Sequence, residues 1–274
     1  DSYKFSKSDY HKIYKNLIKF EERLKKRGQC NGSKETIEKP FLGQHHWLEL
    51  DNNPSKQYLD LYSKPKIMYQ KFQVKPCFIY DEQSLYCNDS MWIIPTDNKA
   101  LLGILNSQMG WWLIKKYCTQ IQNGCQLIWK YFGNIPIPEL NNNNLDLKVN
   151  LMLSRTDEFD VSNNKFTKYL QGQFQLEKLT RKLENWYELS FADFIKELNK
   201  AIKENNKELV KNNLQPIKEL TKLDEMDWMD VFETKKAEAQ NLKQQINSTD
   251  KEIDAMVYEL YGLSEEEINI VENS

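Results

Sequence analysis

Several kinds of segment are missing from this 274-residue sequence. It has no run of eighteen apolar residues, so no transmembrane helix is predicted. Its five cysteines form no C-x-x-C pair, and an odd number without that spacing favours free thiols in a reducing, cytoplasmic compartment. The first residues carry neither an initiator methionine nor a signal-peptide pattern. We therefore expect a fragment of a larger cytoplasmic protein that has no membrane part.

Motifs that mark enzyme active sites are missing as well. No glycine-rich strand-to-helix loop is present for a nucleotide or S-adenosylmethionine, and there is no Walker loop and no H-E-x-x-H. Asn52–Ser55 lacks the Asn/Asp-Pro-Pro-aromatic order that positions a target amine in amino-methyltransferases, and no Pro-Asp…Asp/Glu-x-Lys nuclease set is found. We predict no catalytic residues here and expect any catalysis upstream, in a parent protein.

Histidines and cysteines make only a weak case for a metal site. Cys118, Cys125, His45 and His46 could together supply zinc ligands, but their spacings match no zinc pattern. Separate core cysteines and loop histidines are the favoured interpretation. No nucleophile or carboxylate pair accompanies the two histidines, so they are interpreted as polar loop residues that can touch DNA. No metal ligand is predicted.

What the sequence does contain is ample hydrophobic material and an uneven distribution of charge. Hydrophobic residues make up 40% of the chain and aromatic residues 12%, which suits one large or two small domains. Residues 1–140 hold 20 Lys and Arg against 14 Asp and Glu, a net charge of +6. Residues 141–274 hold 18 against 26, a net charge of −8. This asymmetry is weak evidence for a one-sided polyanion binder.

Short apolar runs predict strands in the first half of the chain. Three of them adjoin a proline: Lys66–Tyr69, Cys77–Tyr80 and Met91–Ile94. Three more are expected to be strands: Trp47–Leu50, Leu85–Cys87 (as a hairpin partner) and Gln126–Tyr131. Two helices accompany these strands. One covers residues 8–27, with Ser8 as cap and Gly28 as stop. The other runs from a cap at Thr96 or Asp97 through an apolar series that ends at Leu113.

The second half begins with four asparagines at 141–144, after which the composition becomes helical. We expect a short helix over 145–153, apolar helical spacing over 174–189 and a turn region at 204–222. Ser190 and Ser264 are expected to cap helices of their own.

The longest predicted helix is Asp227–Tyr261, whose apolar residues recur at alternating steps of four and three. These residues form a line along the helix, the heptad seam. The seam could pack within the chain, against the helices of residues 174–202, or could form a dimeric coiled coil. The first arrangement is favoured, and a homodimer stays open.

Four blocks in the first half carry a resemblance to a known family. In order they are Trp47–Leu50, Lys64–Ile67, Leu101–Ser107 and Ile135–Pro138, of which the last two are the more specific. With these blocks the chain resembles the TaqI-like C-terminal specificity domain. That domain is the target-recognition part of adenine-N6 DNA methyltransferases and of fused type II restriction–modification enzymes. Ile253–Leu263 resembles the closing helix of the fused enzymes.

This resemblance implies a sequence-specific DNA-recognition module of a bacterial enzyme. Residues 1–40 would be a linker helix and loop from an upstream domain, 41–140 the DNA target-recognition domain, and 141–274 a helical domain. The implied fold class is mixed α+β, a small α/β domain followed by a helical bundle or a long antiparallel helical hairpin. The implied partners are double-stranded DNA and the upstream methyltransferase or nuclease domain. The fragment itself would hold no cofactor, whereas the parent would use S-adenosylmethionine, with Mg²⁺ as a further candidate.

Nine polar side chains within and between the predicted strands suit contact with DNA. Lysines would meet phosphates, while Gln and Asn side chains can bond adenine edges in the major groove. The expected DNA-binding residues are Lys71, Gln73, Lys75, Lys115, Lys116, Gln122, Asn123, Gln126 and Lys130. In an extended segment, alternation would put Lys71, Gln73 and Lys75 on one side.

Three other functions stay open. A specificity subunit-like module of a multi-subunit restriction system would need a second recognition domain, and this sequence shows one. A helical scaffold or interaction domain would bind no DNA. If the chain were a free-standing nuclease, it would cleave DNA by itself when a metal ion is added.

Overall fold

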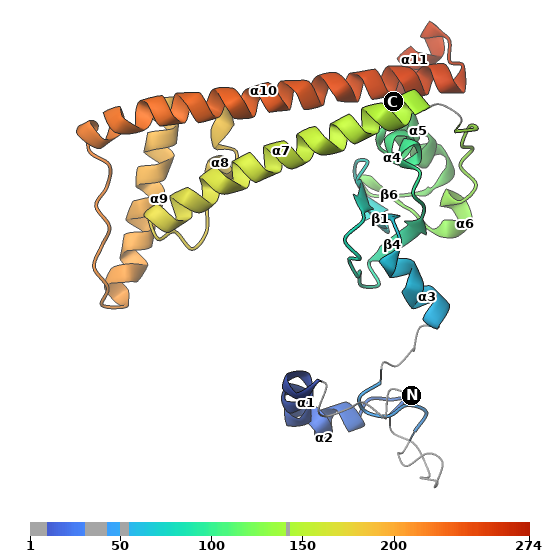
Figure 1. The fold of residues 1–274 in the computed structure, drawn as a ribbon, viewed down its shortest axis with the longest axis horizontal. Helices are drawn as coiled ribbons and strands as arrows, with labels where there is room; N and C mark the ends of the chain where they lie inside the picture. Colours follow the sequence, from blue (N-terminus) through green and yellow to red (C-terminus); the bar gives the residue numbers. More distant parts are fainter. Residues whose placement is uncertain (1–9, 31–42, 50–54, 141–142) are drawn as a thin grey trace. The chain divides into compact units, whose positions relative to one another are not determined.

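The computed structural model describes residues 10–30, 43–49, 55–140 and 143–274, and these build the mixed α+β fold that the sequence predicts (Figure 1). The chain divides into two compact units, residues 1–64 and residues 65–274. In the described part of the chain, no helix is long and apolar enough to cross a membrane.

The first unit contains short helices. They are α1 (His11–Leu17), η2 (Ile18–Phe20), α2 (Glu21–Lys25), α3 (Lys56–Asp60) and η3 (Leu61–Ser63). The single helix predicted over residues 8–27 is therefore interrupted, because the backbone of Phe20 (φ −114°, ψ 8°) leaves the helical region. Its predicted cap, Ser8, lies outside the described residues.

The strand predicted at Trp47–Leu50 is wrong for residues 47–49, which lie in a turn, and Leu50 is outside the described residues. The Arg27 guanidinium donates hydrogen bonds to the carbonyl oxygens of Trp47 (3.1 Å) and Glu49 (2.6 Å). In a strand, those two oxygens would point to the same neighbouring strand. An arginine side chain therefore takes the place of a strand partner here.

The second unit opens with a three-stranded antiparallel sheet in the order β3–β1–β4. Its strands are β1 (Lys66–Gln70), β3 (Phe78–Asp81) and β4 (Met91–Pro95), at the three places where the sequence predicts strands. Leu85–Cys87 is not a strand, so that prediction is wrong. The Asp81 carboxylate accepts the Leu85 N–H (3.0 Å) and holds this segment in a turn. β4 occupies the free edge of β1 instead.

A second sheet joins segments that are far apart in the sequence. Its order is β2–β6–β5, with β2 (Phe72–Gln73), β5 (Thr119–Ile121) and β6 (Gly124–Gln126) all antiparallel. The strand predicted over Gln126–Tyr131 is wrong beyond its first residue, because residues after 128 turn into α6 (Trp129–Phe132). The carbonyl of Ile128 accepts the N–H groups of Tyr131 and Phe132, which closes that helical turn.

The apolar helix of the first half is broken at Ser107 into α4 (Lys99–Asn106) and α5 (Gln108–Tyr117). Ser107 is extended (ψ 164°), and its hydroxyl accepts the N–H of Gly110 as the cap of α5. The cap of α4 is Asn98 rather than the expected Thr96 or Asp97. These two helices and both sheets share one hydrophobic core.

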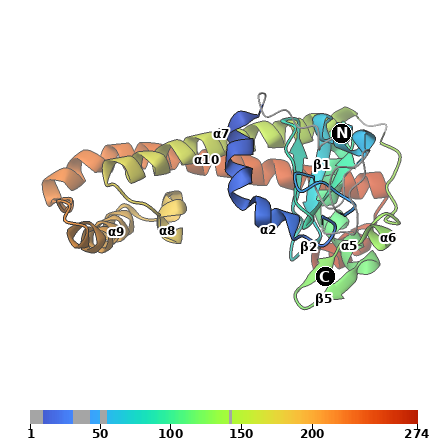
Figure 2. The same cartoon turned by 90° about the horizontal axis from the view of Figure 1, so that it is seen from below.

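Two long helices contribute residues both to that core and to a second hydrophobic core. α7 (Asn143–Gln173) and α10 (Lys222–Tyr261) run side by side in opposite directions (Figures 1 and 2), with an ion pair between Lys148 and Glu252 at one end and a ring contact between Phe166 and Trp228 at the other. α7 covers 31 residues, so the short helix predicted over 145–153 is only its first part. α10 begins at Lys222, inside the expected turn region, because Thr221 and Asp224 form a capping box.

The far end of these helices holds a second hydrophobic cluster, rich in aromatic rings. It is completed by α8 (Arg181–Glu184), η4 (Trp186–Glu188) and α9 (Phe191–Lys211), so residues 174–189 are mostly not helical. Ser190 caps α9 as predicted, and Ser264 caps the closing α11 (Glu265–Glu272). The heptad seam of α10 is covered mainly by α7, while rings of η4 and α9 cover Phe232. Packing within the chain therefore accounts for the seam.

Candidate nucleic-acid interface

The nine predicted DNA-binding residues all lie on the β2–β6–β5 sheet or within four residues of one of its strands. Lys71 and Lys75 flank β2, whereas Lys115 and Lys116 end the helix that leads into β5. Lys130 lies on α6, which follows β6. The pairing of β2 with β6 brings residues near 72 against residues near 125, so this gathering depends on the tertiary fold.

One side of the β2–β6 pair is buried, whereas β5 is exposed along its whole length. The register places Gln73 and Cys125 directly opposite each other, and both are buried. The neighbouring row consists of Phe72, Gln126 and Thr119, which must point to the other face because side chains alternate along a strand. Phe72 is 41% exposed, which identifies this row as the outward face.

The outward face combines an aromatic ring, an amide and a hydroxyl on a closely packed backbone. A Cβ atom at Gly124 would lie 2.8 Å from the Phe72 ring and 2.4 Å from the Gln73 carbonyl oxygen. Only glycine therefore fits under the phenylalanine ring. Ile121, opposite Gly124 and 39% exposed, completes the face. Sequence reasoning did not select Phe72, Thr119 or Ile121, because the pairing of β2 with β6, and not a local pattern, determines which row turns outward.

Gln73 corrects the predicted interface. Its side chain is 3% exposed, with the amide oxygen accepting the N–H of Cys77 (2.9 Å) and the amide nitrogen donating to the carbonyl oxygen of Cys77 (3.3 Å). It closes the turn after β2 and cannot reach DNA. The expected arrangement, in which Gln73 shares an exposed side with Lys71 and Lys75, is wrong because the sheet buries the Gln73 row.

Four predicted lysines remain available around the sheet. Lys75 is exposed and, among the described residues, forms no ion pair. The ammonium groups of Lys71, Lys116 and Lys130 lie over aromatic rings, at 5.3 to 5.5 Å from the ring centroids of Trp92, Trp112 and Tyr131 respectively. Each ring supports the lysine stem without neutralising its charge. These four cations can therefore still meet phosphates.

Lys115 is held more firmly than the others. Its ammonium donates to the main-chain oxygen of Ser274 (2.6 Å), and its own carbonyl accepts the Gln120 side chain (3.1 Å). It lies near the buried Cys125, whose thiol has a pKa raised by burial, an effect that the positive charge of Lys115 opposes. Lys115 thus joins α5 to Ser274 and is a weaker candidate for contact with DNA.

Gln122 and Asn123 form the two-residue turn between β5 and β6. Both are exposed, and the backbone of Gln122 has φ +51°, a left-handed conformation that glycine adopts at lower cost. Two amide side chains are thereby presented at the tip of a hairpin. Gln126, half-buried on β6, presents a third amide on the outward face.

A buried ion pair holds the neighbouring sheet in shape. The Lys66 ammonium, with no exposed surface, contacts the carboxylate of Asp81, which is 3% exposed. That carboxylate also accepts the N–H groups of Gln83 and Leu85. Three donors thus satisfy this buried anion, so the pair is structural.

The two histidines are also engaged within the first unit. His45 lies 3.5 Å from the Glu49 carboxylate, and the His46 ring accepts the N–H of Leu48 (3.3 Å). Burial lowers the pKa of His46. Within the described ranges, no group of three His, Cys, Asp or Glu side chains could hold a metal ion.

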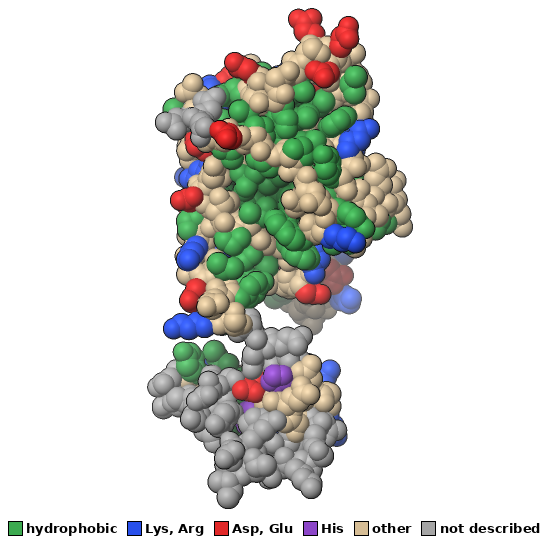
Figure 3. Space-filling view, turned by 90° about the vertical axis from the view of Figure 1, so that its right-hand side faces the viewer, with side chains coloured by type: hydrophobic (Ala, Val, Ile, Leu, Met, Phe, Trp, Pro, Cys, Tyr) green, Lys and Arg blue, Asp and Glu red, His purple; other side chains and the backbone are tan. Residues whose placement is uncertain are grey.

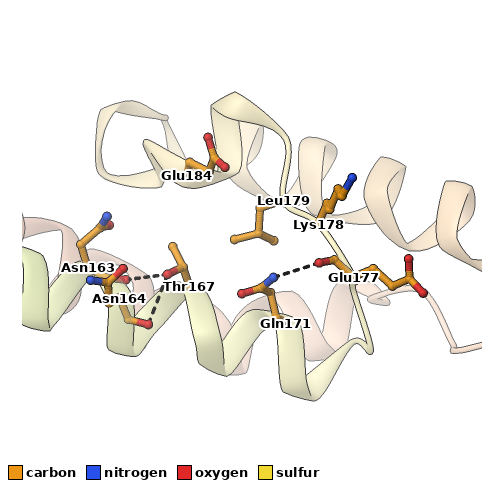
Figure 4. A pocket seen from close by; sticks show the side chains of 8 residues that line it. All are labelled: Asn163, Asn164, Thr167, Gln171, Glu177, Lys178, Leu179 and Glu184. Atoms are coloured by element: carbon orange, nitrogen blue, oxygen red, sulfur yellow. Dashed lines mark hydrogen bonds between the residues drawn. The ribbon is translucent and has the colours of Figure 1, made fainter. Parts of the chain in front are cut away.

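A polar pocket of about 460 Å³ lies far from the sheets, between α7 and the segment that precedes α8 (Figure 4). Its polar groups serve the fold. Thr167 donates to the carbonyl oxygen of Asn163, whose side-chain oxygen accepts the indole N–H of Trp186, and Gln171 donates to the carbonyl oxygen of Glu177. We assign no chemistry to it.

A second kind of surface on residues 65–274 is apolar. Hydrophobic side chains gather over much of the face seen in Figure 3, with lysine and arginine side chains at its sides. One apolar hollow of about 110 Å³ is lined by Ile94 of β4, Leu101 of α4 and Trp129 of α6, among others. Such a surface suits packing against protein rather than against phosphates.

Comparison with known families agrees with this geometry. Residues 10–137 match the TaqI-like C-terminal specificity domain, and residues 138–257 match a domain of unknown function, DUF8810. No curated protein matches the chain. The first match contains both sheets, α4, α5 and all nine predicted DNA-binding residues. The similarity of residues 10–137 to the TaqI-like C-terminal specificity domain therefore supports a DNA-specificity module of the restriction–modification type in this part of the chain.

Proposed function

We propose that this chain recognises duplex DNA through the outward face of the β2–β6–β5 sheet and the lysines around it. The observation that carries the proposal is the convergence of Phe72, Gln126, the Gln122–Asn123 turn and exposed lysines on one small sheet. These groups come from segments about fifty residues apart, and together they offer an aromatic ring, amides and cations to one ligand.

The chemistry of these groups fits a duplex. Lys71, Lys75, Lys116 and Lys130 would neutralise phosphates and supply affinity that depends strongly on salt. Amide side chains can form paired hydrogen bonds with the N6 and N7 atoms of adenine in the major groove, and each good pair discriminates by about 1–3 kcal/mol. A two-residue hairpin tip is narrow enough to enter that groove.

We further propose that the chain is the recognition part of a bacterial adenine DNA methyltransferase, with or without an endonuclease. The parent would flip the target adenine out of the duplex, and this chain would supply sequence choice and grip. S-adenosylmethionine does not fit the residues present, because the sequence has no glycine-rich loop for it. It, and Mg²⁺ for any cleavage, would belong to an upstream catalytic domain. The apolar face of residues 65–274 is suited to contact that domain.

The test is an electrophoretic shift assay at several salt concentrations with the full chain. Replacing both Lys116 and Lys130 by Gln should lower the salt slope by about 1.8, which changes the affinity ratio to wild type roughly tenfold between 50 and 200 mM salt. The matched control replaces Lys165 and Lys168, two exposed lysines on α7. Equal losses in both variants would contradict an interface at the sheet.

Base reading is tested separately from affinity. Gln122→Gly keeps the turn, because glycine readily adopts the positive φ found there, but removes one amide from the hairpin tip. We expect selection from a random duplex pool to yield a less restricted sequence for this variant, with its melting temperature preserved. An unchanged selected sequence would exclude Gln122 from base reading.

The same assays separate the other candidate functions. A helical scaffold predicts no shift, or one that is indifferent to salt. A free-standing nuclease predicts metal-dependent cleavage by this chain. A module of a multi-subunit restriction system predicts specific binding to only half of a two-part site, because the sequence shows one recognition domain.

A further inference from the structure

The acidic second half of the chain contains one strongly basic line of side chains. α9 carries lysines at steps of four, three, four and four residues: Lys196, Lys200, Lys203, Lys207 and Lys211. At 3.6 residues per turn, these positions fall within an arc of about 80° on the helix. We call this set the α9 lysine stripe.

The stripe faces away from the core. The buried residues of α9, among them Phe194, Leu198 and Ile202, lie on the opposite side of the helix, about 180° from the centre of the stripe. All five lysines are exposed. Lys203 and Lys211 form exposed ion pairs with Glu219 and Glu208. The remaining three, at positions 196, 200 and 207, form no ion pair with any described residue.

Of the four acidic side chains of α9, two have partners outside the stripe and one pairs with a lysine of the stripe itself. Glu197 is 9% exposed and pairs with Lys182 (2.7 Å). Asp193 accepts the Ser190 hydroxyl (2.7 Å) at the start of the helix. Glu208 pairs with Lys211. Glu204 is exposed at the edge of the stripe, so α9 carries five lysines against four carboxylates, and its net positive charge lies on the side of the stripe.

The length of the stripe suits a duplex that crosses it. Fifteen residues at 1.5 Å each span about 22 Å. α9 runs across the long helices (Figures 1 and 2), so a duplex that follows α10 crosses the stripe instead of lying along it. Because the major groove is about 12 Å wide, flexible lysine side chains placed every 4.5 to 6 Å along this line can reach phosphates on both sides of that groove. None of the five is placed to read a base.

α9 is fixed at a distance from the sheets by the long helices (Figures 1 and 2). Phe232 of α10 stacks on Phe194 of α9, with ring centroids 4.6 Å apart. Ile253, further along α10, packs near Gly103 of α4. The 21 residues between these two contacts correspond to about 32 Å, or roughly nine base pairs.

We propose that the α9 lysine stripe is a second DNA site, which grips the phosphate backbone about one helical turn away from the bases read by the sheet. This gives the segment that matches DUF8810 a role, namely sequence-independent anchoring at a fixed distance. The inference rests on the proposed function, since the sheet sets where the duplex lies. An acidic protein partner would suit the lysines too, but their regular spacing and the recognition domain in the same unit favour DNA.

The test compares duplexes of two lengths, using the full chain and the sequence enriched from a random pool. A 14-bp duplex that just covers the site ends before α9, whereas a 44-bp duplex extends past it on both sides. We expect the variant with Lys196, Lys200 and Lys207 all changed to Gln to bind the 14-bp duplex like wild type. On the 44-bp duplex its salt slope should be smaller by about 2.7, so that wild type loses about 40-fold more affinity than the variant between 50 and 200 mM salt.

The matched control changes Lys165, Lys168 and Lys178 to Gln, three exposed lysines at the same end of the long helices. Three results would each overturn the α9 site. The control could lose as much of its salt slope as the variant, the variant could lose salt slope on both duplex lengths, or the variant could lose none on the 44-bp duplex. In those cases the selected sequence should persist, and the proposed function would stand. If the wild-type chain enriches no sequence and shifts no duplex, both proposals fall. Circular dichroism melting confirms that each variant is folded.

Discussion

Gly103 lies in the Leu101–Ser107 block that carries much of the family resemblance, and we predict that replacing it by alanine destabilises the protein. A Cβ atom at this position would lie 2.6 Å from a methyl carbon of Val149 and 3.6 Å from one of Ile253. Val149 belongs to α7 and Ile253 to α10, and both are buried. The missing side chain therefore lets α4 approach both long helices closely.

The expected magnitude is the difference between two opposing effects. Alanine in a helix interior is favoured over glycine by about 1 kcal/mol. Forcing an extra carbon into a packed core typically costs about 1–3 kcal/mol, and a 2.6 Å contact with a buried valine belongs at the upper end. We expect Gly103→Ala to lower the free energy of unfolding by about 2 kcal/mol.

Urea unfolding followed by circular dichroism measures this change, and Gly172 supplies the control. Gly172 lies on α7, with nothing within 4 Å of a Cβ added there, so Gly172→Ala should raise the free energy of unfolding by about 1 kcal/mol. Adding Val149→Ala to Gly103→Ala should restore room, so the double variant should be more stable than the sum of the single effects by at least about 1 kcal/mol. If Gly103→Ala proves as stabilising as Gly172→Ala, then α4 does not approach α7 and α10 as closely as described here.

Three further predictions concern the same unit. Asn106 donates to and accepts from the main chain of Phe78 (2.9 and 3.0 Å), so Asn106→Ala should cost about 1–3 kcal/mol in urea unfolding, and an unchanged midpoint would contradict it. Burial alone would raise the pKa of Asp81, but the hydrogen bonds from Lys66 and two main-chain N–H groups lower it below its usual value near 3.8. The ionised Asp81 carboxylate should therefore stabilise the fold fully above pH 3.8, and this contribution to the free energy of unfolding should disappear as the pH falls below that value. Asp81→Asn should not show this loss of stability at low pH. Burial raises the pKa of Asp254 to about 6, so the folded state binds its proton first, and stability should rise as the pH falls from about 6 to 3.8. Asp254→Asn, measured by unfolding at pH 4 to 7, should abolish that rise.

The Leu101–Ser107 block illustrates what a family motif can mean physically. Gly103 allows α4 to approach α7 and α10 closely, and Asn106 forms hydrogen bonds with the main chain of the edge strand β3. Ser107 follows the end of α4 and caps α5. Each residue therefore has a structural task, and none of the three belongs to the proposed DNA interface. In this chain the block fixes the fold, whereas the proposed recognition surface lies on other elements.

Local chemistry made several elements predictable from the sequence alone. Apolar runs beside prolines gave β1, β3 and β4, because proline limits where a strand can begin or end. Ser190 and Ser264 were predictable as caps, because a hydroxyl followed three residues later by a carboxylate satisfies the free N–H groups at a helix start. The mixed fold class follows from those elements.

Tertiary structure decided the rest. Pairing of β2 with β6 across about fifty residues buries Gln73 and exposes Phe72, and no local pattern reveals which row of such short strands turns inward. α7 extends to 31 residues because α10 covers it along its length, although its own apolar pattern is weak. The spacing of lysines on α9 was already present in the sequence. What only the folded chain determined is that this line faces solvent at a fixed distance from the sheets, because packing rather than propensity sets which side of a helix is covered.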